Sequence, residues 1–205
     1  KEVCVDSLED AINAEKNGAD RIELCARLDL DGLTPSRNLI KESFNSLNIP
    51  IRVMIRPKHP SFVYSEEEIY KMLDEINYCK KIGVDGVVLG CLDNDSNFNM
   101  NQIEFLSKKA KPLNVIIHKS IDSTKSVILS FLQLIQNRDI SGVLTSGGHR
   151  FAKDAIKTLK KMLDLAPERF EVICAGGITF ENLNNLHSLI NGKYYHGKKI
   201  LKNYK

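Results

Sequence analysis

The chain has 205 residues, of which 42% are hydrophobic and 27% charged, a balance that predicts one soluble globular domain over residues 1–205. No apolar run approaches the roughly 18 residues of a membrane span, and glycine and proline are too few for a collagen-like or low-complexity chain. The formal net charge of +3 is spread along the chain, so neither nucleic acid nor a membrane is an expected partner. Five cysteines stand apart in apolar segments, which predicts free thiols in a reducing cytoplasm.

Short β-branched runs alternate with longer segments of helical period, the pattern of repeated βαβ units around a parallel sheet. Eight such runs predict an α/β fold of the (β/α)8 TIM-barrel type, with a shortened or missing last helix because few residues follow the eighth run. An open doubly wound sheet is the main alternative, but residues 6–8 lack the Gly-rich turn common after its first strand. The expected strands are Glu2 to Val5, Arg21 to Leu24, Ile51 to Arg56, Gly86 to Leu89, Asn114 to His118, Gly142 to Thr145, Glu171 to Cys174 and Lys193 to His196.

Two of the intervening helices carry clear boundary signals. One is expected to start after Ser7, which can cap it, and to end at Gly18; another is expected to start after Ser65 and to end at Gly83. The junctions at residues 18–22 and 83–87 resemble each other and lie 65 residues apart, about two βα units. This repetition favours the barrel.

Polar and sulfur-bearing residues recur at alternate positions near the strand ends, where a barrel interior is usually filled by Val, Ile and Leu. They are Glu2, Cys4, Glu23, Cys25, Met54, Arg56, His118, Thr145, Cys174 and His196. Period-two geometry sends them to one face, so we expect Glu23, Arg56 and His118 to meet at one mouth of the barrel as a functional cluster. The alternative is a buried ion-pair network of Glu2, Glu23 and Arg56, with His118 a hydrogen-bonded core residue.

Two turns rich in small residues follow the sixth and seventh expected strands. They read Thr145-Ser146-Gly147-Gly148 and Ala175-Gly176-Gly177-Ile178. Glycines let backbone N–H groups approach a ligand, and the last strand-to-helix loops of such barrels often bind phosphate. We therefore expect an anion site there, completed by Arg56; the alternative is that both are merely tight turns.

Several ordered segments together resemble one known family. They include Glu2-Val3-Cys4-Val5-Asp6-Ser7, residues 18–25, Gly32-Leu33-Thr34-Pro35-Ser36, Met54-Ile55-Arg56-Pro57, residues 62–65, 86–90, 118–122 and 144–147, and Tyr195-His196. Over nearly the whole chain they are similar to the CutC family of copper-homeostasis proteins. The resemblance implies a (β/α)8 barrel, a cytoplasmic location and a homo-oligomer, either a dimer or a tetramer.

The chain departs from the family pattern at three places. Where the family has His-Arg-Ala-Phe-Asp, this chain has His118-Lys119-Ser120-Ile121-Asp122, and an ammonium cannot form the two-pronged contact of a guanidinium. Residues 58–61 replace a Gly-Gly-Asp stretch, and the seventh turn has one glycine fewer. The family also extends further at the C-terminus.

The first functional hypothesis is copper homeostasis with Cu(I) binding. The resemblance implies that Cys4 and Cys25 hold the ion, and soft thiolates do select Cu(I). Met54 has the same parity on the next expected strand and could add a thioether, a hypothesis from spacing alone. The alternative is that the cysteines are small buried hydrophobic residues, as we expect for Cys79, with Cys91 at most a rim residue.

The second hypothesis is an enzyme or binder acting on a small anionic metabolite, such as a phosphorylated one. Arg56 would hold the anion, both turns would donate N–H groups, and Glu23 and His118 would exchange protons as general base and acid. Asp122 would orient His118 or Lys119. A third possibility, a non-catalytic oligomeric scaffold, leaves the inward polar cluster unexplained.

Overall fold

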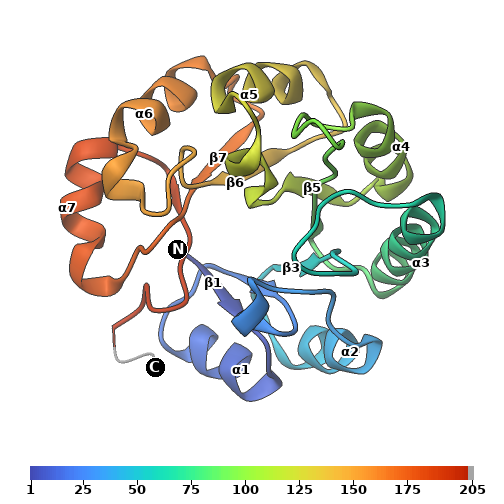
Figure 1. Ribbon diagram of the computed structural model, residues 1–205. Coiled ribbons are helices and arrows are strands. Elements are labelled where there is room, and N and C mark those ends of the chain that lie inside the picture. Colours follow the sequence, from blue (N-terminus) through green and yellow to red (C-terminus); the bar gives the residue numbers. More distant parts are fainter. Residues whose placement is uncertain (203–205) are drawn as a thin grey trace.

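The computed structural model describes residues 1–202 and shows eight parallel strands paired in sequential order, ringed by helices (Figure 1). The first and last strands meet through a parallel bridge between Glu2 and His196, and the Gly197 N–H donates to the Glu2 carbonyl oxygen at 3.1 Å. The predicted (β/α)8 barrel is therefore confirmed. The strands are β1 (Glu2–Val5), β2 (Arg21–Leu24), β3 (Ile51–Met54), β4 (Gly86–Leu89), β5 (Asn114–Ile117), β6 (Gly142–Thr145), β7 (Glu171–Cys174) and β8 (Tyr194–Tyr195).

Seven α-helices cover the outside of the barrel, and no helix follows β8 within residues 196–202. Ser7 caps the first one, accepting a hydrogen bond from the Asp10 N–H at 3.1 Å, and Ser65 forms a capping box with Glu68. Gly83 ends its helix in the left-handed conformation, with φ +90°. The α-helices are α1 (Leu8–Lys16), α2 (Arg37–Ser46), α3 (Glu66–Ile82), α4 (Met100–Ala110), α5 (Val127–Gln136), α6 (Ile156–Leu165) and α7 (Phe180–Ile190).

Three short 3-10 helices lie in the loops that follow strands or lead into helices: η1 (Leu28–Leu30), η2 (Lys119–Ser123) and η3 (Ala152–Asp154). No helix formed by residues 1–202 is both long enough and apolar enough to cross a bilayer.

The apolar residues form two separate clusters, as strand alternation requires. The larger one packs between the strands and the surrounding helices. The smaller one fills the interior of the barrel and consists of Cys25, Met54, Val88, Ile116, Leu144, Ile173 and Ala175. The barrel is therefore packed, and only its two ends are polar.

The prediction that Thr145 and Cys174 share the inward face is wrong. The register pairs Leu144 with Ile173 and Thr145 with Cys174, and the first pair belongs to the interior cluster. Cys174 belongs instead to the layer beneath the helices. Gly142 and Glu171 begin β6 and β7 and face inward. Leu144 and Ile173, two residues later in each strand, therefore face inward as well.

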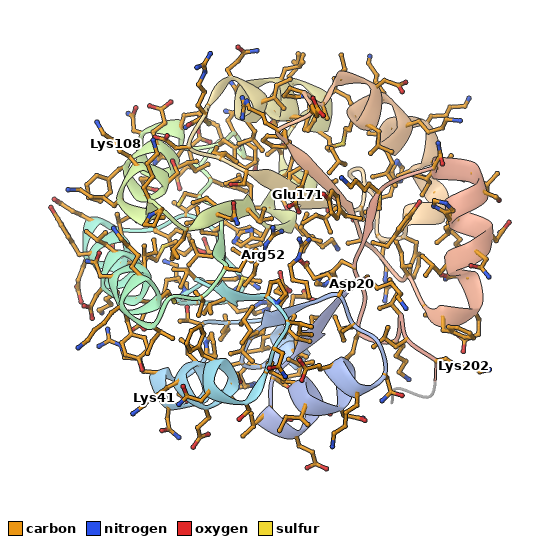
Figure 2. All side chains as sticks on the ribbon, turned by 180° about the vertical axis from the view of Figure 1, so that it is seen from behind. Asp20, Lys41, Arg52, Lys108, Glu171 and Lys202 are labelled. Atoms are coloured by element: carbon orange, nitrogen blue, oxygen red, sulfur yellow. The ribbon has the colours of Figure 1, made fainter. Side chains whose placement is uncertain are left out.

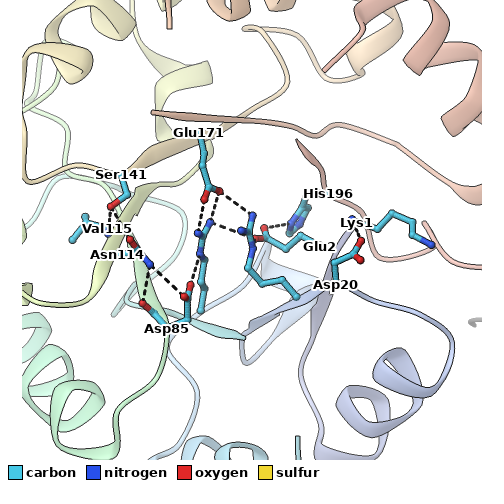
Figure 3. Close-up of polar contacts among 11 residues, drawn as sticks. Lys1, Glu2, Asp20, Asp85, Asn114, Val115, Ser141, Glu171 and His196 are labelled. Atoms are coloured by element: carbon cyan, nitrogen blue, oxygen red, sulfur yellow. Dashed lines mark hydrogen bonds and ion pairs between the residues drawn. The ribbon is translucent and has the colours of Figure 1, made fainter. Parts of the chain in front are cut away.

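An ion-pair network closes the N-terminal end of the barrel (Figure 3). Arg52 is 2% exposed and donates to both carboxylate oxygens of Glu171, at 2.9 and 3.0 Å, and to Asp85 at 3.0 Å. Arg21 bridges Glu2 and Glu171, with N···O distances of 2.5 and 3.1 Å. Seen from behind, Arg52 and Glu171 lie near the centre of the ring of strands, while Lys41 and Lys108 lie on the surrounding helices (Figure 2). A cavity of about 370 Å³ lies at this end, and a larger one opens at the opposite end, the C-terminal mouth.

Candidate functional site at the barrel mouth

A cavity of about 500 Å³ opens at the C-terminal mouth, and we call it the mouth cavity. A volume of this size accommodates a small metabolite. It is lined by six of the residues predicted from the sequence to form the site: Cys4, Glu23, Met54, Arg56, His118 and Asp122. His196, Phe62, Lys119 and Lys198 complete much of the remaining wall. The expected meeting of residues from different strands is thus observed.

The cysteines lie at the side of the mouth formed by β1 and β2. Cys4 lines the mouth cavity and is partly exposed, whereas Cys25 is fully buried directly beneath the wall. A Cβ atom built on Gly32 would lie 3.1 Å from the Cys25 Sγ and 3.6 Å from the Met54 Cε, so both side chains converge on that glycine. Burial raises the pKa of the Cys25 thiol well above its usual value, and the neighbouring Glu23 carboxyl raises it further.

Glu2, Glu23 and His196 form a buried acid–imidazole cluster between the mouth and the N-terminal network. His196 Nδ1 donates to Glu2 Oε1 at 2.8 Å, and His196 Nε2 lies 3.7 Å from Glu23 Oε2. Burial alone would lower the pKa of His196, but Glu23, Cys4 and Glu2 outweigh it and raise that pKa well above 6.5. Burial likewise opposes ionisation of Glu2, yet His196 and the two arginines hold the pKa of Glu2 at about 2.

These three residues each offer a ligand atom within 4.8 Å of the others, so the cluster has the spacing of a cation site. The Glu2 oxygens are already paired, Oε1 with His196 and Oε2 with Arg21. The protonated imidazole therefore fills the place that a cation would take. Cu(I), a soft ion, also has little preference for carboxylate oxygens.

Arg56 is a buried cation, 3% exposed, held by backbone carbonyls. Its Nη1 donates to the carbonyl oxygens of residues 30, 31 and 32 at 3.1 to 3.3 Å, and its Nη2 lies 3.2 Å from His59 Nδ1. The guanidinium lies 4.6 Å above the Phe62 ring. Within residues 1–202 it has no carboxylate within 4.0 Å, and its Nε makes no direct hydrogen bond, although the buried Tyr64 hydroxyl interacts with the guanidinium. Arg56 therefore does not form the ion-pair network that was the alternative to a functional cluster, and the buried ion pairs are made by Arg52.

His118 is also buried, and its ring is fixed from both sides. The Ser120 N–H donates to His118 Nδ1 at 3.2 Å, and the Phe62 ring lies 4.9 Å from the imidazole, centroid to centroid. Burial, reinforced by the charge of Arg56, lowers the pKa of His118 to about 3. Because Nδ1 accepts a hydrogen bond, the neutral ring carries its proton on Nε2, which has no partner. A side chain at the neighbouring position 90 would collide with the imidazole, since a Cβ built on Gly90 would lie 2.8 Å from His118 Cε1.

Asp122 does not orient His118 or Lys119. Its carboxylate instead accepts hydrogen bonds from the turn after β6, namely from the N–H groups of Ser146 and Gly148 at 2.9 and 2.8 Å and from the hydroxyls of Thr145 and Ser146. The Ser146 and Gly148 N–H groups, which we expected to bind an external anion, therefore bind the Asp122 carboxylate instead. Neither this turn nor the one after β7 lines the mouth cavity.

The glycines after β7 allow close packing against the loop before η3. A Cβ on Gly176 would lie 2.6 Å from the Ser146 Cβ, and one on Gly177 would lie 2.7 Å from the Phe151 ring. A Cβ built on Gly147 would likewise lie 2.6 Å from the Ala155 Cβ. All three have positive φ angles. Packing of the β6 and β7 turns against each other thus accounts for these residues without a ligand.

Reasoning from sequence missed Arg52 and Ser120, and it left His196 outside the candidate site. Arg52 has the same strand parity as Met54 and Arg56, so its inward position could have been deduced. The role of Ser120 depends on its backbone N–H, which no residue pattern encodes. Cys79, Cys91 and Cys174 are buried outside the mouth cavity, and burial raises the pKa of each thiol to about 12.

Fold and site together define a (β/α)8 barrel with a polar, sulfur-lined cavity at its C-terminal mouth. The CutC family model matches residues 1–201, so the chain belongs to the CutC family. It is 38% identical over 185 residues to the human copper homeostasis protein cutC homolog, covering 90% of this chain and 67% of that one. A CutC family protein of Pasteurella multocida is 37% identical over 181 residues, 88% of this chain and 74% of the relative.

Solved structures agree with this assignment. The crystal structure of a putative copper homeostasis protein CutC from Streptococcus agalactiae superimposes with a TM-score of 0.91 at 30% identity, covering 97% of this chain and 98% of the other. A dihydrodipicolinate synthase from Cyanidioschyzon merolae reaches a TM-score of 0.69 at 13% identity, covering 97% of this chain and 69% of the other. At that identity only the barrel fold is shared.

Proposed function

We propose that this protein acts in copper homeostasis by binding Cu(I) through the thiolates of Cys4 and Cys25 at the barrel mouth. The observation that carries the proposal is the position of the two thiols. They come from adjacent strands on the inward face, where Cys4 pairs with Glu23 and Cys25 follows two residues later. The copper homeostasis names of the human and Streptococcus agalactiae relatives support it.

The surroundings suit a soft monovalent ion. Cu(I) prefers thiolate and thioether ligands, and Met54 lies beside Cys25 with its thioether in the mouth wall. Binding must release the Cys25 proton, which is costly because burial and Glu23 raise the pKa of that thiol. The ion's own positive charge offsets this cost.

Anaerobic Cu(I) competition titration of the reduced protein tests the proposal. We expect tight binding by the wild type and a loss of at least tenfold in affinity in the Cys4→Ser, Cys25→Ser double variant, with a smaller loss in Met54→Leu. The matched control is a Cys79→Ser, Cys174→Ser double variant, which removes two buried thiols far from the mouth and keeps the affinity. Equal affinity in both double variants, with folding verified by circular dichroism, would refute thiolate binding at the mouth.

A cytoplasmic location and assembly as a homodimer or homotetramer belong to the same proposal. Both rest on the family resemblance, and the free thiols, which suit a reducing compartment, also support the location. Light scattering coupled to size-exclusion chromatography distinguishes the assemblies from a 23.1 kDa monomer.

A second candidate function is binding of a small anion in the same cavity, and one observation favours it. The buried Arg56 guanidinium is held by backbone carbonyls, but within residues 1–202 no carboxylate lies within 4.0 Å to neutralise its charge, which a bound anion would do. A pKa of about 3 keeps the His118 imidazole neutral at pH 7. His118 would therefore act as a hydrogen-bond donor and not as the proton-exchanging partner of Glu23.

A further inference from the structure

Three residues that line the mouth cavity each carry a buried polar atom without a hydrogen-bond partner. Six buried side-chain atoms within residues 1–202 lack a hydrogen-bond partner, and three of the six are Glu23 Oε1, Arg56 Nε and His118 Nε2. All three residues are at most 3% exposed, and all line the mouth cavity. Folded proteins seldom leave buried polar groups unpaired, so their convergence in one cavity indicates a missing ligand.

The chemical character of these atoms is fixed by the bonds that the rest of each group already makes. His118 Nε2 is a donor because Nδ1 accepts from Ser120. Arg56 Nε is a donor, and the carbonyls of residues 30–32 hold its guanidinium in place. Glu23 Oε1 is the free oxygen, because Oε2 accepts from the Cys25 thiol at 3.6 Å and faces His196. These three atoms therefore offer two donors and one acceptor, and the positive charge of Arg56 is accompanied by Lys119 and Lys198 in the wall of the same cavity.

We infer that the mouth cavity binds a small hydroxy carboxylate, whose carboxylate accepts from Arg56 Nε and His118 Nε2 and whose hydroxyl donates to Glu23 Oε1. This inference deepens the second candidate function and rests on it. A phosphate group has more acceptor oxygens than a carboxylate, and the turn N–H groups that could serve them are already bonded to Asp122.

Both donors are held in place before any ligand arrives. The Phe62 ring contacts both side chains, at 4.6 Å from the guanidinium carbon and 4.9 Å from the imidazole centroid. Ordering these side chains therefore costs little on binding, which is the usual basis of affinity in a small polar site. The neutral imidazole is also suited to this task, because protonation would place a second cation beside Arg56.

Isothermal titration calorimetry with lactate, propionate and inorganic phosphate tests the inference on the full chain. We expect saturable lactate binding and about tenfold weaker propionate binding, because propionate lacks the hydroxyl and leaves Glu23 Oε1 unpaired. The variant His118→Phe keeps a ring against Phe62 but removes the Nε2 donor, and it should weaken lactate at least tenfold. His149→Phe, at an exposed histidine outside the cavity, should bind lactate like the wild type.

A second measurement does not depend on how the variant folds. In wild-type protein with 15N-labelled histidine, we expect NMR to show His118 in the Nε2–H form, with that nitrogen shifting when lactate is added. Equal affinity for lactate and propionate would overturn the hydroxyl contact, and an unmoved His118 signal would overturn the carboxylate contact.

The remaining outcomes distinguish a failure of this inference from a failure of the proposed functions. Phosphate binding tighter than lactate binding would keep the anion site but overturn the hydroxy carboxylate. Absence of binding by all three probes would overturn both. His118→Phe should keep wild-type Cu(I) affinity, so a failed copper titration and a failed lactate titration are independent results.

Discussion

The two ring nitrogens of His118 show how a single backbone contact defines a site residue. The Ser120 N–H occupies Nδ1, and burial beside Arg56 lowers the pKa of the ring to about 3. An unfolded chain would bind a proton at this histidine near pH 6.5. His118 is therefore a fixed hydrogen-bond donor at neutral pH, and its low pKa makes the folded state less stable in acid.

This difference in pKa predicts a pH dependence of stability. The stabilising effect of keeping His118 neutral is complete above pH 6.5 and is lost as pH falls from 6.5 towards 3, because only the unfolded chain takes up the proton in that range. Between pH 7.5 and 5 the contribution to the free energy of unfolding is about 2 kcal/mol. Urea denaturation at both pH values should show a drop in the wild type that is smaller by this amount in His118→Gln. An equal drop in both proteins would contradict the account.

Asp122 acts at the scale of elements, because it joins η2 to the turn after β6. Its carboxylate receives two backbone N–H groups and two hydroxyls from that turn. The 3-10 helix and the turn are thus held together beside the cavity wall. A carboxamide of the same shape cannot accept all of these bonds, since its NH2 group is itself a donor.

We therefore expect Asp122→Asn to lower the free energy of unfolding by about 3 kcal/mol. Thermal or urea denaturation measures the change, and Asp95→Asn, at an exposed loop aspartate, is the control with little effect. Stability equal to that of the control variant would show that the carboxylate does not hold the turn.

At the element scale the sequence predicted strands and capped helices well and short connections poorly. The Ser7 and Ser65 caps signal their helices through local chemistry alone. The 3-10 helices over 28–30, 119–123 and 152–154 carry no comparable periodicity, because one turn is too short to show it. The inward placement of Thr145 failed because a four-residue strand with one polar end fits either parity.

At the scale of the whole molecule, the two ends of the barrel have different tasks. The N-terminal end carries an ion-pair network in which Arg52 satisfies Glu171 and Asp85, whereas the mouth leaves polar atoms unpaired. The sequence placed Glu23, Arg56 and His118 at one mouth, because each lies near the end of its strand. Arg52 lies near the start of β3 with the same parity as Arg56, but it was not recognised as an inward residue, so the N-terminal network was not predicted.

Replacing Arg52, the central cation of the N-terminal network, should therefore reduce the stability of the fold and leave the mouth cavity unchanged. We expect Arg52→Met to lower the free energy of unfolding by about 3 to 5 kcal/mol, because Glu2, Asp85 and Glu171 lose their shared partner. Chemical denaturation measures this loss, and Arg27→Met, at an exposed arginine paired only with Asp29, should leave stability unchanged. An unaltered denaturation midpoint in Arg52→Met would contradict the structural role of the network.

The central claim, that the mouth holds Cu(I) by sulfur, is tested most directly by X-ray absorption at the copper K edge. The sample is the wild-type protein loaded anaerobically with one equivalent of Cu(I). The account predicts a first shell of sulfur atoms, supplied by Cys4 and Cys25 with Met54 beside them. A first shell of nitrogen and oxygen atoms alone would contradict it and would assign the cysteines to packing.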